Sequence, residues 1–158
     1  MGFFGKLKSA VNVVTGGAAK VNVEFNEATF GESLIVTINA TTKAECKVDK
    51  VYLKFRGVEE IELEDTDYSD RDGDGDTERT SERIHRSHTT FETEYVVSGP
   101  QEIGEDESVQ WQFEVPMPEH LQPTYRGHYC SHQYEVQAGL DMFGNDPDSG
   151  WVDVPFIR

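Results

Sequence analysis

The stretch SVQWQFEV, residues 108–115, alternates polar and apolar side chains without a break. Val109, Trp111, Phe113 and Val115 fall on one side of the alternation, and polar residues fall on the other. In a β-strand successive side chains point to opposite faces of the sheet, so this period places one face in a core and the other in water. The stretch therefore predicts a half-buried strand and an all-β fold.

The same period of two recurs on both sides of this stretch. Turn-forming residues separate the repeats, as expected when short strands follow one another. Roughly seven or eight short strands with almost no helix are typical of an immunoglobulin-like β-sandwich. Gly57 predicts a bulge within one long or bent strand. The alternating stretches are residues 20–26, 34–39, 50–56, 60–64, 91–97, 133–141 and 152–156.

The N-terminal segment has a different period. Its apolar residues recur at helical spacing until Gly16 and Gly17, which predicts a short amphipathic helix over residues 1–17 and one sandwich domain over residues 18–158. We expect the apolar face to pack over an open end of the sandwich. A partner groove is the alternative, and a membrane surface is disfavoured because the helix is short and has only two lysines. The residues proposed to contact a partner are Phe3, Phe4 and Leu7.

Charge and cysteine content narrow the classes of function. The chain of 158 residues has a formal charge of −16, which argues against a nucleic-acid partner because phosphate binding needs clustered Lys and Arg. The two cysteines, Cys46 and Cys130, are far apart and no export signal is recognisable. Free thiols in a cytoplasmic protein are the expectation. No stretch is long and apolar enough to span a bilayer.

Much of the negative charge lies between Glu59 and Glu82, and within this stretch we interpret residues 65–81 as an acidic hairpin loop. Carboxylates at every second position, followed by a glycine, can direct several oxygens at one calcium ion. A complete calcium loop would have Glu where Ser81 stands, so a solvated acidic loop without metal is the alternative. Calcium is the one cofactor that the sequence suggests, with ligands Asp70, Asp72, Asp74 and Asp76.

The sequence contains a second, less specific set of possible metal ligands. One face of a predicted strand carries His128, Cys130 and His132. Imidazole and thiolate groups together can bind zinc. A further ligand would come from His120 or from the pair His85 and His88. A Zn²⁺-dependent enzyme is therefore an alternative. The other interpretation places Cys130 and His132 at the edge of the core, each with a hydrogen bond. Because the sequence has no recognisable catalytic motif, we expect no enzymatic activity.

Several motifs together resemble a known family. Residues 3–42, FFGKLKSAVNVVTGGAAKVNVEFNEATFGESLIVTINATT, and residues 46–55, CKVDKVYLKF, resemble the start of the bacterial sporulation-control arrestin-like proteins. Residues 113–126, FEVPMPEHLQPTYR, and residues 139–156, GLDMFGNDPDSGWVDVPF, resemble later parts of the same family. The resemblance implies an arrestin-like sandwich and a cytoplasmic regulatory or scaffolding role without catalysis. Family members commonly carry two such domains, whereas we expect one here.

These observations predict a non-catalytic arrestin-like module that binds protein partners. The partner is expected to add a strand to an exposed sheet edge or to contact the loops at one end of the sandwich. A calcium-binding sandwich whose loop at Asp70–Asp76 becomes ordered on metal is the alternative. The sequence leaves open whether copies of the chain associate.

Overall fold

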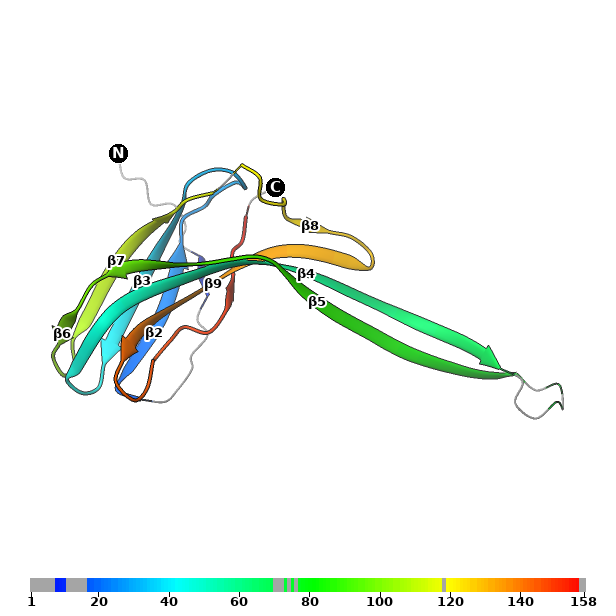
Figure 1. The fold of residues 1–158 in the computed structure, drawn as a ribbon, viewed down its shortest axis with the longest axis horizontal. Coiled ribbons are helices and arrows are strands. Elements are labelled where there is room, and N and C mark those ends of the chain that lie inside the picture. The colour runs from blue at the N-terminus through cyan, green and yellow to red at the C-terminus, as the bar shows by residue number, and fades with distance from the viewer. Residues whose placement is uncertain are drawn as a thin grey trace.

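The computed structural model describes residues 8–10, 17–69, 73, 75, 77–117 and 119–156. Its strands form two antiparallel sheets that lie face to face (Figure 1), and the described residues contain no helix. The all-β prediction is therefore confirmed. The strands are β1 (Lys8–Ala10), β2 (Ala19–Phe25), β3 (Leu34–Thr42), β4 (Cys46–Ser69), β5 (Glu78–Ser98), β6 (Gln101–Ile103), β7 (Ser108–Val115), β8 (Tyr125–Arg126), β9 (Cys130–Met142) and β10 (Val152–Asp153).

The first sheet has the order β1-β2-β3-β7. β3 lies inside it and pairs with β2 on one side and β7 on the other. Leu34, Val36, Ile38 and Ala40 of β3 are each at most 1% exposed, so one face of the strand is in the core. Alternation in the sequence therefore determines which face of this sheet meets the core.

The second sheet has the order β10-β9-β4-β5, with β6 paired to β4 and β8 paired to β9. The register between β4 and β5 shifts at Gly57/Val58, where Gly57 faces Phe91 and Val58 faces Thr89. Thr90 is the extra residue, so β5 is the bulged strand. The irregularity predicted at Gly57 is thus confirmed.

The core is one cluster of apolar side chains contributed by both sheets. At its centre the ring of Tyr134 stacks on Phe55, with centroids 5.1 Å apart, and on Phe30, with centroids 5.5 Å apart. Burying a large apolar side chain stabilises a fold by about 1.5–3 kcal/mol. This cluster is therefore the main source of stability for the body of the molecule.

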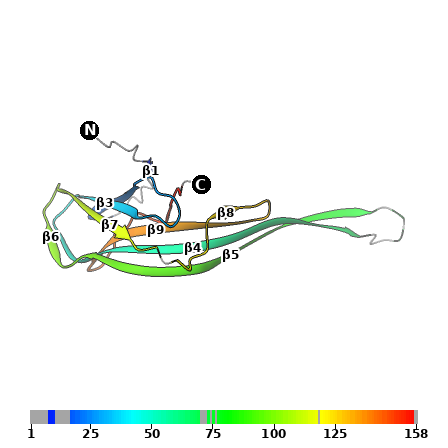
Figure 2. The same cartoon turned by 90° about the horizontal axis from the view of Figure 1, so that it is seen from above.

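β4 and β5 continue past the sandwich as a projecting two-stranded arm, which we define as residues 59–69 and 78–88 (Figures 1 and 2). β9 accompanies β4 only as far as Ile61, which faces Cys130. Beyond that point each strand of the arm pairs with a single strand among the described residues, although the Glu62 N–H still donates a hydrogen bond to the Tyr129 carbonyl oxygen. The strands also extend into the segment predicted as a loop over residues 65–81, because β4 ends at Ser69 and β5 begins at Glu78.

The prediction of an N-terminal helix over residues 1–17 is not supported. Within that range Lys8–Ala10 form β1, which pairs with the edge of β2 so that Lys8 faces Phe25. A helix of this length is marginal in water, whereas the edge of β2 offers backbone hydrogen bonds to any extended segment. Phe3, Phe4 and Leu7 lie outside the described residues.

Candidate functional site

The outer edge of β7 is open. β7 ends the first sheet, and in the described part of the chain it pairs only with β3. The register runs without a shift from Leu34 facing Val115 to Thr41 facing Ser108. The strand has no proline, lysine or arginine. Because these are the features that normally block pairing at an edge, β7 presents a row of backbone N–H and C=O groups to a further strand.

Aromatic side chains border this edge. Val109, Trp111 and Phe113 of β7 are half-buried and pack against the core cluster. The ring of Phe113 lies 5.0 Å from that of Tyr95 on β5, the end strand of the other sheet. The side of the sandwich between β5 and β7 is therefore closed by side chains alone. An added strand could place apolar side chains against this partly exposed surface.

The edge of β5 differs from that of β7. Its pairing with β4 has register shifts at Val51/Tyr52 and at Gly57/Val58. The stretch between them exposes Glu92 and Glu94. Bulges and charges are common devices against strand addition. In the body of the molecule, β7 is therefore the more receptive of the two edges.

A buried polar cluster lies where the arm leaves the sandwich. His132 is 1% exposed, with Nε2 2.7 Å from the Thr90 hydroxyl and Nδ1 3.1 Å from the Pro123 carbonyl oxygen. Because a carbonyl oxygen can only accept, Nδ1 donates to Pro123, and Nε2 is hydrogen-bonded to the Thr90 hydroxyl. Gly57 makes room for this pair, since a Cβ there would lie 2.6 Å from Thr90 Oγ1.

Two tyrosines extend this cluster. Tyr125 stacks on His132 at 6.2 Å and donates a hydrogen bond of 2.8 Å to Glu59, and this bond to a carboxylate raises the pKa of Tyr125 to about 12. Tyr134 donates to the carbonyl oxygen of Gln122, and burial raises the pKa of Tyr134 to about 12. These bonds attach β8 and the preceding loop to β9 and β4.

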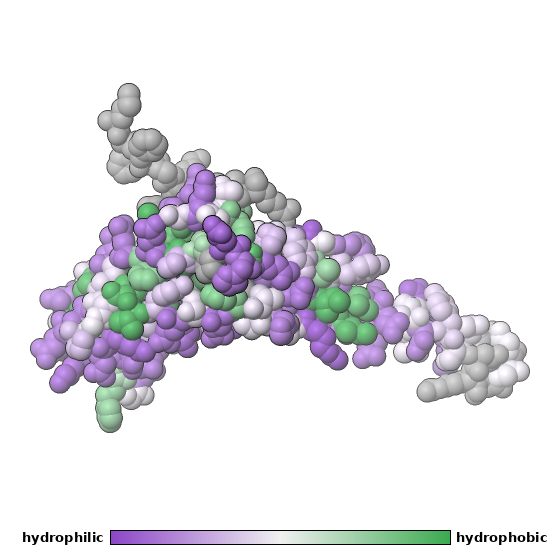
Figure 3. Space-filling model, turned by 45° about the horizontal axis from the view of Figure 1, so that its top comes forward, coloured by the Kyte–Doolittle hydropathy of each residue, from purple (hydrophilic) through white to green (hydrophobic). Residues whose placement is uncertain are grey.

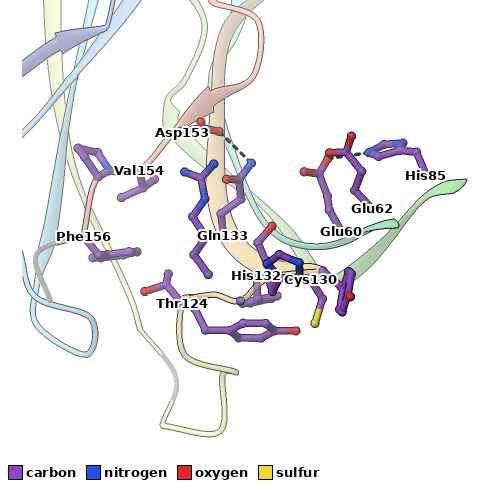
Figure 4. Close-up of a pocket in the computed structure, with 17 residues that line it drawn as sticks. Glu60, Glu62, His85, Thr124, Cys130, His132, Gln133, Asp153, Val154 and Phe156 are labelled. Atoms are coloured by element: carbon purple, nitrogen blue, oxygen red, sulfur yellow. Dashed lines mark hydrogen bonds and ion pairs between the residues drawn. The ribbon is translucent and has the colours of Figure 1, made fainter. Parts of the chain in front are cut away.

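A cavity of about 510 Å³ lies beside the cluster (Figure 4). Its lining includes Glu60, which is 3.8 Å from His85, and Asp153, whose carboxylate accepts a hydrogen bond of 3.3 Å from Gln133. Burial, followed by the charges of Glu135 and Glu60, raises the pKa of Asp153. The lining of the cavity thus includes the carboxylates of Glu60, Glu62 and Asp153.

The structure does not support a zinc site at the predicted residues. Both nitrogens of His132 already have hydrogen-bond partners, which a metal ion would have to displace. The described residues contain no group of three or more His, Cys, Asp or Glu side chains arranged to hold a metal ion. The zinc site at His128, Cys130 and His132 is therefore not supported. The alternative is confirmed for His132, which is buried at the edge of the core with hydrogen bonds.

The calcium prediction concerns residues that the structure does not describe. Asp70, Asp72, Asp74 and Asp76 lie outside the described residues. Between them Gly73 and Gly75 have φ of 67° and 88°. Such angles favour glycine, because L side chains are strained there. Calcium binding stays a prediction.

The β7 edge was only partly foreseeable. The sequence identifies the strand and its inward face, but strand order is a property of the whole sheet, so nothing local marks β7 as an end strand. The absence of lysine and proline in residues 108–115 is the one signal in the sequence.

In the described part of the chain no helix could cross a membrane.

Comparison with known proteins identifies the fold. No curated protein sequence matches the chain. A crystal structure of Spo0M, a sporulation control protein from Bacillus subtilis, matches with a TM-score of 0.56 at 20% identity, over 88% of this chain and 49% of that one. This chain thus spans about half the length of that relative. The family model described as arrestin (or S-antigen), N-terminal domain, matches residues 29–148, which is more than half of the sequence. The chain belongs to the arrestin N-terminal domain family.

Proposed function

We propose that this chain is a non-catalytic regulatory or scaffolding module of the cytoplasm that binds a protein partner by strand addition to β7. The observation that carries the proposal is the open edge of β7, which keeps an unbroken register over eight residues. Backbone hydrogen bonds supply affinity in this mode of binding, and alternate side chains supply specificity. Membership of the arrestin N-terminal domain family supports a role in regulation without catalysis.

The side chains beside the edge define the partner's chemistry. One face of an added strand continues the inner face of the first sheet and meets the half-buried Trp111 and Phe113. The other face continues the outer row of Gln110, Gln112 and Glu114 and meets water. The partner is therefore an extended protein segment with apolar residues at every second position.

A random-peptide display selection on the full chain tests this proposal. The expected ligands alternate apolar and polar residues, bind with micromolar affinity, and protect the amides of residues 108–115 from hydrogen exchange. The variant Gln110→Lys with Gln112→Lys places lysines on the outer face of the edge strand, and we expect it to weaken binding about tenfold.

The matched control is Gln137→Lys, the same change on β9, which lies inside the other sheet. It is expected to bind the selected peptides as the unmodified chain does. Ligands that lack alternation, or that protect β5 or the loops while β7 stays unprotected, would show that strand addition to β7 is wrong.

Calcium binding by the segment of Asp70–Asp76 is a second candidate function, and the positive φ angles of Gly73 and Gly75 favour it. Glycines at these positions let a short chain turn so that neighbouring carboxylates converge. This proposal is independent of the β7 edge, and a titration described below tests it.

A further inference from the structure

The two strands of the arm carry different charge. The half contributed by β4, residues 59–69, has six acidic residues and no lysine or arginine. The half contributed by β5, residues 78–88, mixes two glutamates with three arginines and two histidines. The β4 edge therefore presents one sign of charge, whereas the β5 edge presents both.

One face of the arm carries apolar side chains that no other strand covers among the described residues. Leu63 faces Ile84 across the two strands, and Ile61 lies on the same face of β4 as Leu63, so the three form an apolar patch. Ile61 is 37% exposed, and hydrophobic surface is visible on the arm in Figure 3. A two-stranded hairpin is marginally stable in water, and a third and fourth strand would stabilise it. Among the described residues, the β5 edge of the arm is thus unpaired along its whole length, whereas the β4 edge pairs with β9 as far as Ile61, and no other strand covers the apolar patch.

We propose that the β5 edge of the arm pairs antiparallel with the β5 edge of a second copy, with Ile84 of each copy at the two-fold axis. In this register Glu82 of one copy faces Arg86 of the other, and Arg86 of the first faces Glu82 of the second. The same surface is used by both copies, as in a closed dimer. The two hairpins become one four-stranded sheet.

Charge and hydrophobicity both favour this register. Residues 82, 84 and 86 share a face, so two opposite-charge pairs flank a row of Leu63, Ile84 and their counterparts in the second copy. On the other face Arg83 approaches His85 of the second copy, but Arg83 is already 3.2 Å from Glu62, and His85 is 3.8 Å from Glu60. Pairing through the β4 edges would instead bring carboxylates together.

Charge reversal at the two central positions tests the proposal. The variants are Glu82→Arg and Arg86→Glu in the full chain, and the measurement is sedimentation velocity over a concentration series. Each copy carries a formal charge of −16, so the buffer contains about 0.15 M salt, where the Debye length is about 8 Å. The unmodified chain is expected to dimerise in a concentration-dependent way.

Each single variant places two like-charge pairs at the axis, and we expect it to associate about tenfold or more weakly than the unmodified chain. An equimolar mixture of the two variants is expected to recover association. In the mixed dimer the arginine introduced at position 82 faces the glutamate introduced at position 86, and the two unchanged residues, Arg86 and Glu82, face each other. The double variant Glu82→Arg with Arg86→Glu is expected to recover association too. Recovery in the mixture depends on contact between copies, which a fault in folding would not produce.

The controls make the same charge changes at exposed positions of the body, Glu105→Arg and Lys47→Glu. Both are expected to associate as the unmodified chain does. A chain that stays monomeric at all concentrations, single variants that dimerise unchanged, or a mixture that fails to recover would each overturn the proposal. The Gln110→Lys and Gln112→Lys changes on β7 are expected to leave this dimer intact, which separates it from the proposed strand addition.

Discussion

The two halves of β4 contrast in what surrounds them. In the body, residues 51–58 have β9 and β5 as neighbours and the other sheet beneath, and Val51, Leu53 and Phe55 are fully buried. In the arm, residues 63–69 pair only with β5 among the described residues, and most of their side chains are exposed. Both halves keep the period of a strand. The period thus defines the strand, whereas stability comes from what covers it.

The largest effect that tests this contrast is expected at Phe55. Its ring stacks on Tyr134 and meets Phe91 edge-on at 6.1 Å, so Phe55→Ala removes a central part of the core. We expect the free energy of unfolding to fall by about 3–5 kcal/mol. Urea unfolding followed by tryptophan fluorescence measures the change.

Leu63→Ala, on the same strand in the arm, is the comparison. Leu63 is only half-buried, and we expect a loss below about 1 kcal/mol in the monomer. A loss of similar size at both positions would mean that the arm contributes to the cooperative core, which contradicts the contrast.

The next effect is expected at the junction between the two halves. A Cβ on Gly57 would lie 2.6 Å from Thr90 Oγ1 and 3.0 Å from His132 Nε2, so Gly57→Ala must displace one of the two. Overpacking of this kind costs about 1–3 kcal/mol. Gly99→Ala is the matched control, since a Cβ there meets no described atom within 4 Å. Equal stability of the two variants would show that the junction tolerates a side chain.

Much of the sandwich was predictable, because period-two alternation depends on local sequence alone. β7 was predicted with its observed bounds, Ser108–Val115, and the bulge at Gly57 followed from one glycine within a strand pattern. The N-terminal segment misled because its apolar spacing fits a helix, while Lys8–Ala10 pair with an edge that the sequence does not reveal. Residues 60–64 of the arm were predicted as a strand, but the rest of the arm was missed because its charged residues suggested a solvated loop. Alternating charges are tolerated where both faces of a hairpin meet water.

The sites were less predictable than the fold. The open edge of β7 and the proposed pairing surface of β5 both depend on strand order, which no local pattern encodes. His132 suggested a metal ligand because imidazole has that chemistry, but Thr90 and Pro123 come from other parts of the chain to occupy its nitrogens. Residues distant in sequence thus decided the role of the side chain.

A smaller, pH-dependent effect is expected at Asp153 in the body. Its pKa is raised above the ordinary value of 3.8 by burial and by the nearby charges of Glu135 and Glu60. The folded state therefore binds the proton more tightly than the unfolded chain. The stabilisation that protonated Asp153 gives the folded state is fully present below pH 3.8. It is lost as the pH rises through the raised pKa of Asp153 in the folded state.

Asp153→Asn keeps a carbonyl oxygen for the bond from Gln133 and removes the charge. We expect the variant to be more stable than the unmodified chain by roughly 0.5 kcal/mol at neutral pH, and equally stable at about pH 3. Thermal unfolding at the two pH values measures the difference. Asp67→Asn in the arm is the control, because its exposed side chain is expected to change stability little at either pH. A gain at Asp153 that is the same at both pH values would contradict the electrostatic cause.

The smallest effect is expected from calcium at the far end of the arm. A ligand at a free concentration equal to its dissociation constant stabilises a protein by about 0.4 kcal/mol, so calorimetric titration is a better measurement than unfolding. We expect saturable heat with calcium, little with magnesium, and none in the variant Asp72→Asn with Asp74→Asn. Heat that persists in the variant would place the ion elsewhere, and no heat in the unmodified chain would leave the segment as a charged connection between β4 and β5. In that case the arm would depend for its function on its edges alone, and pairing through β5 would be the property to measure.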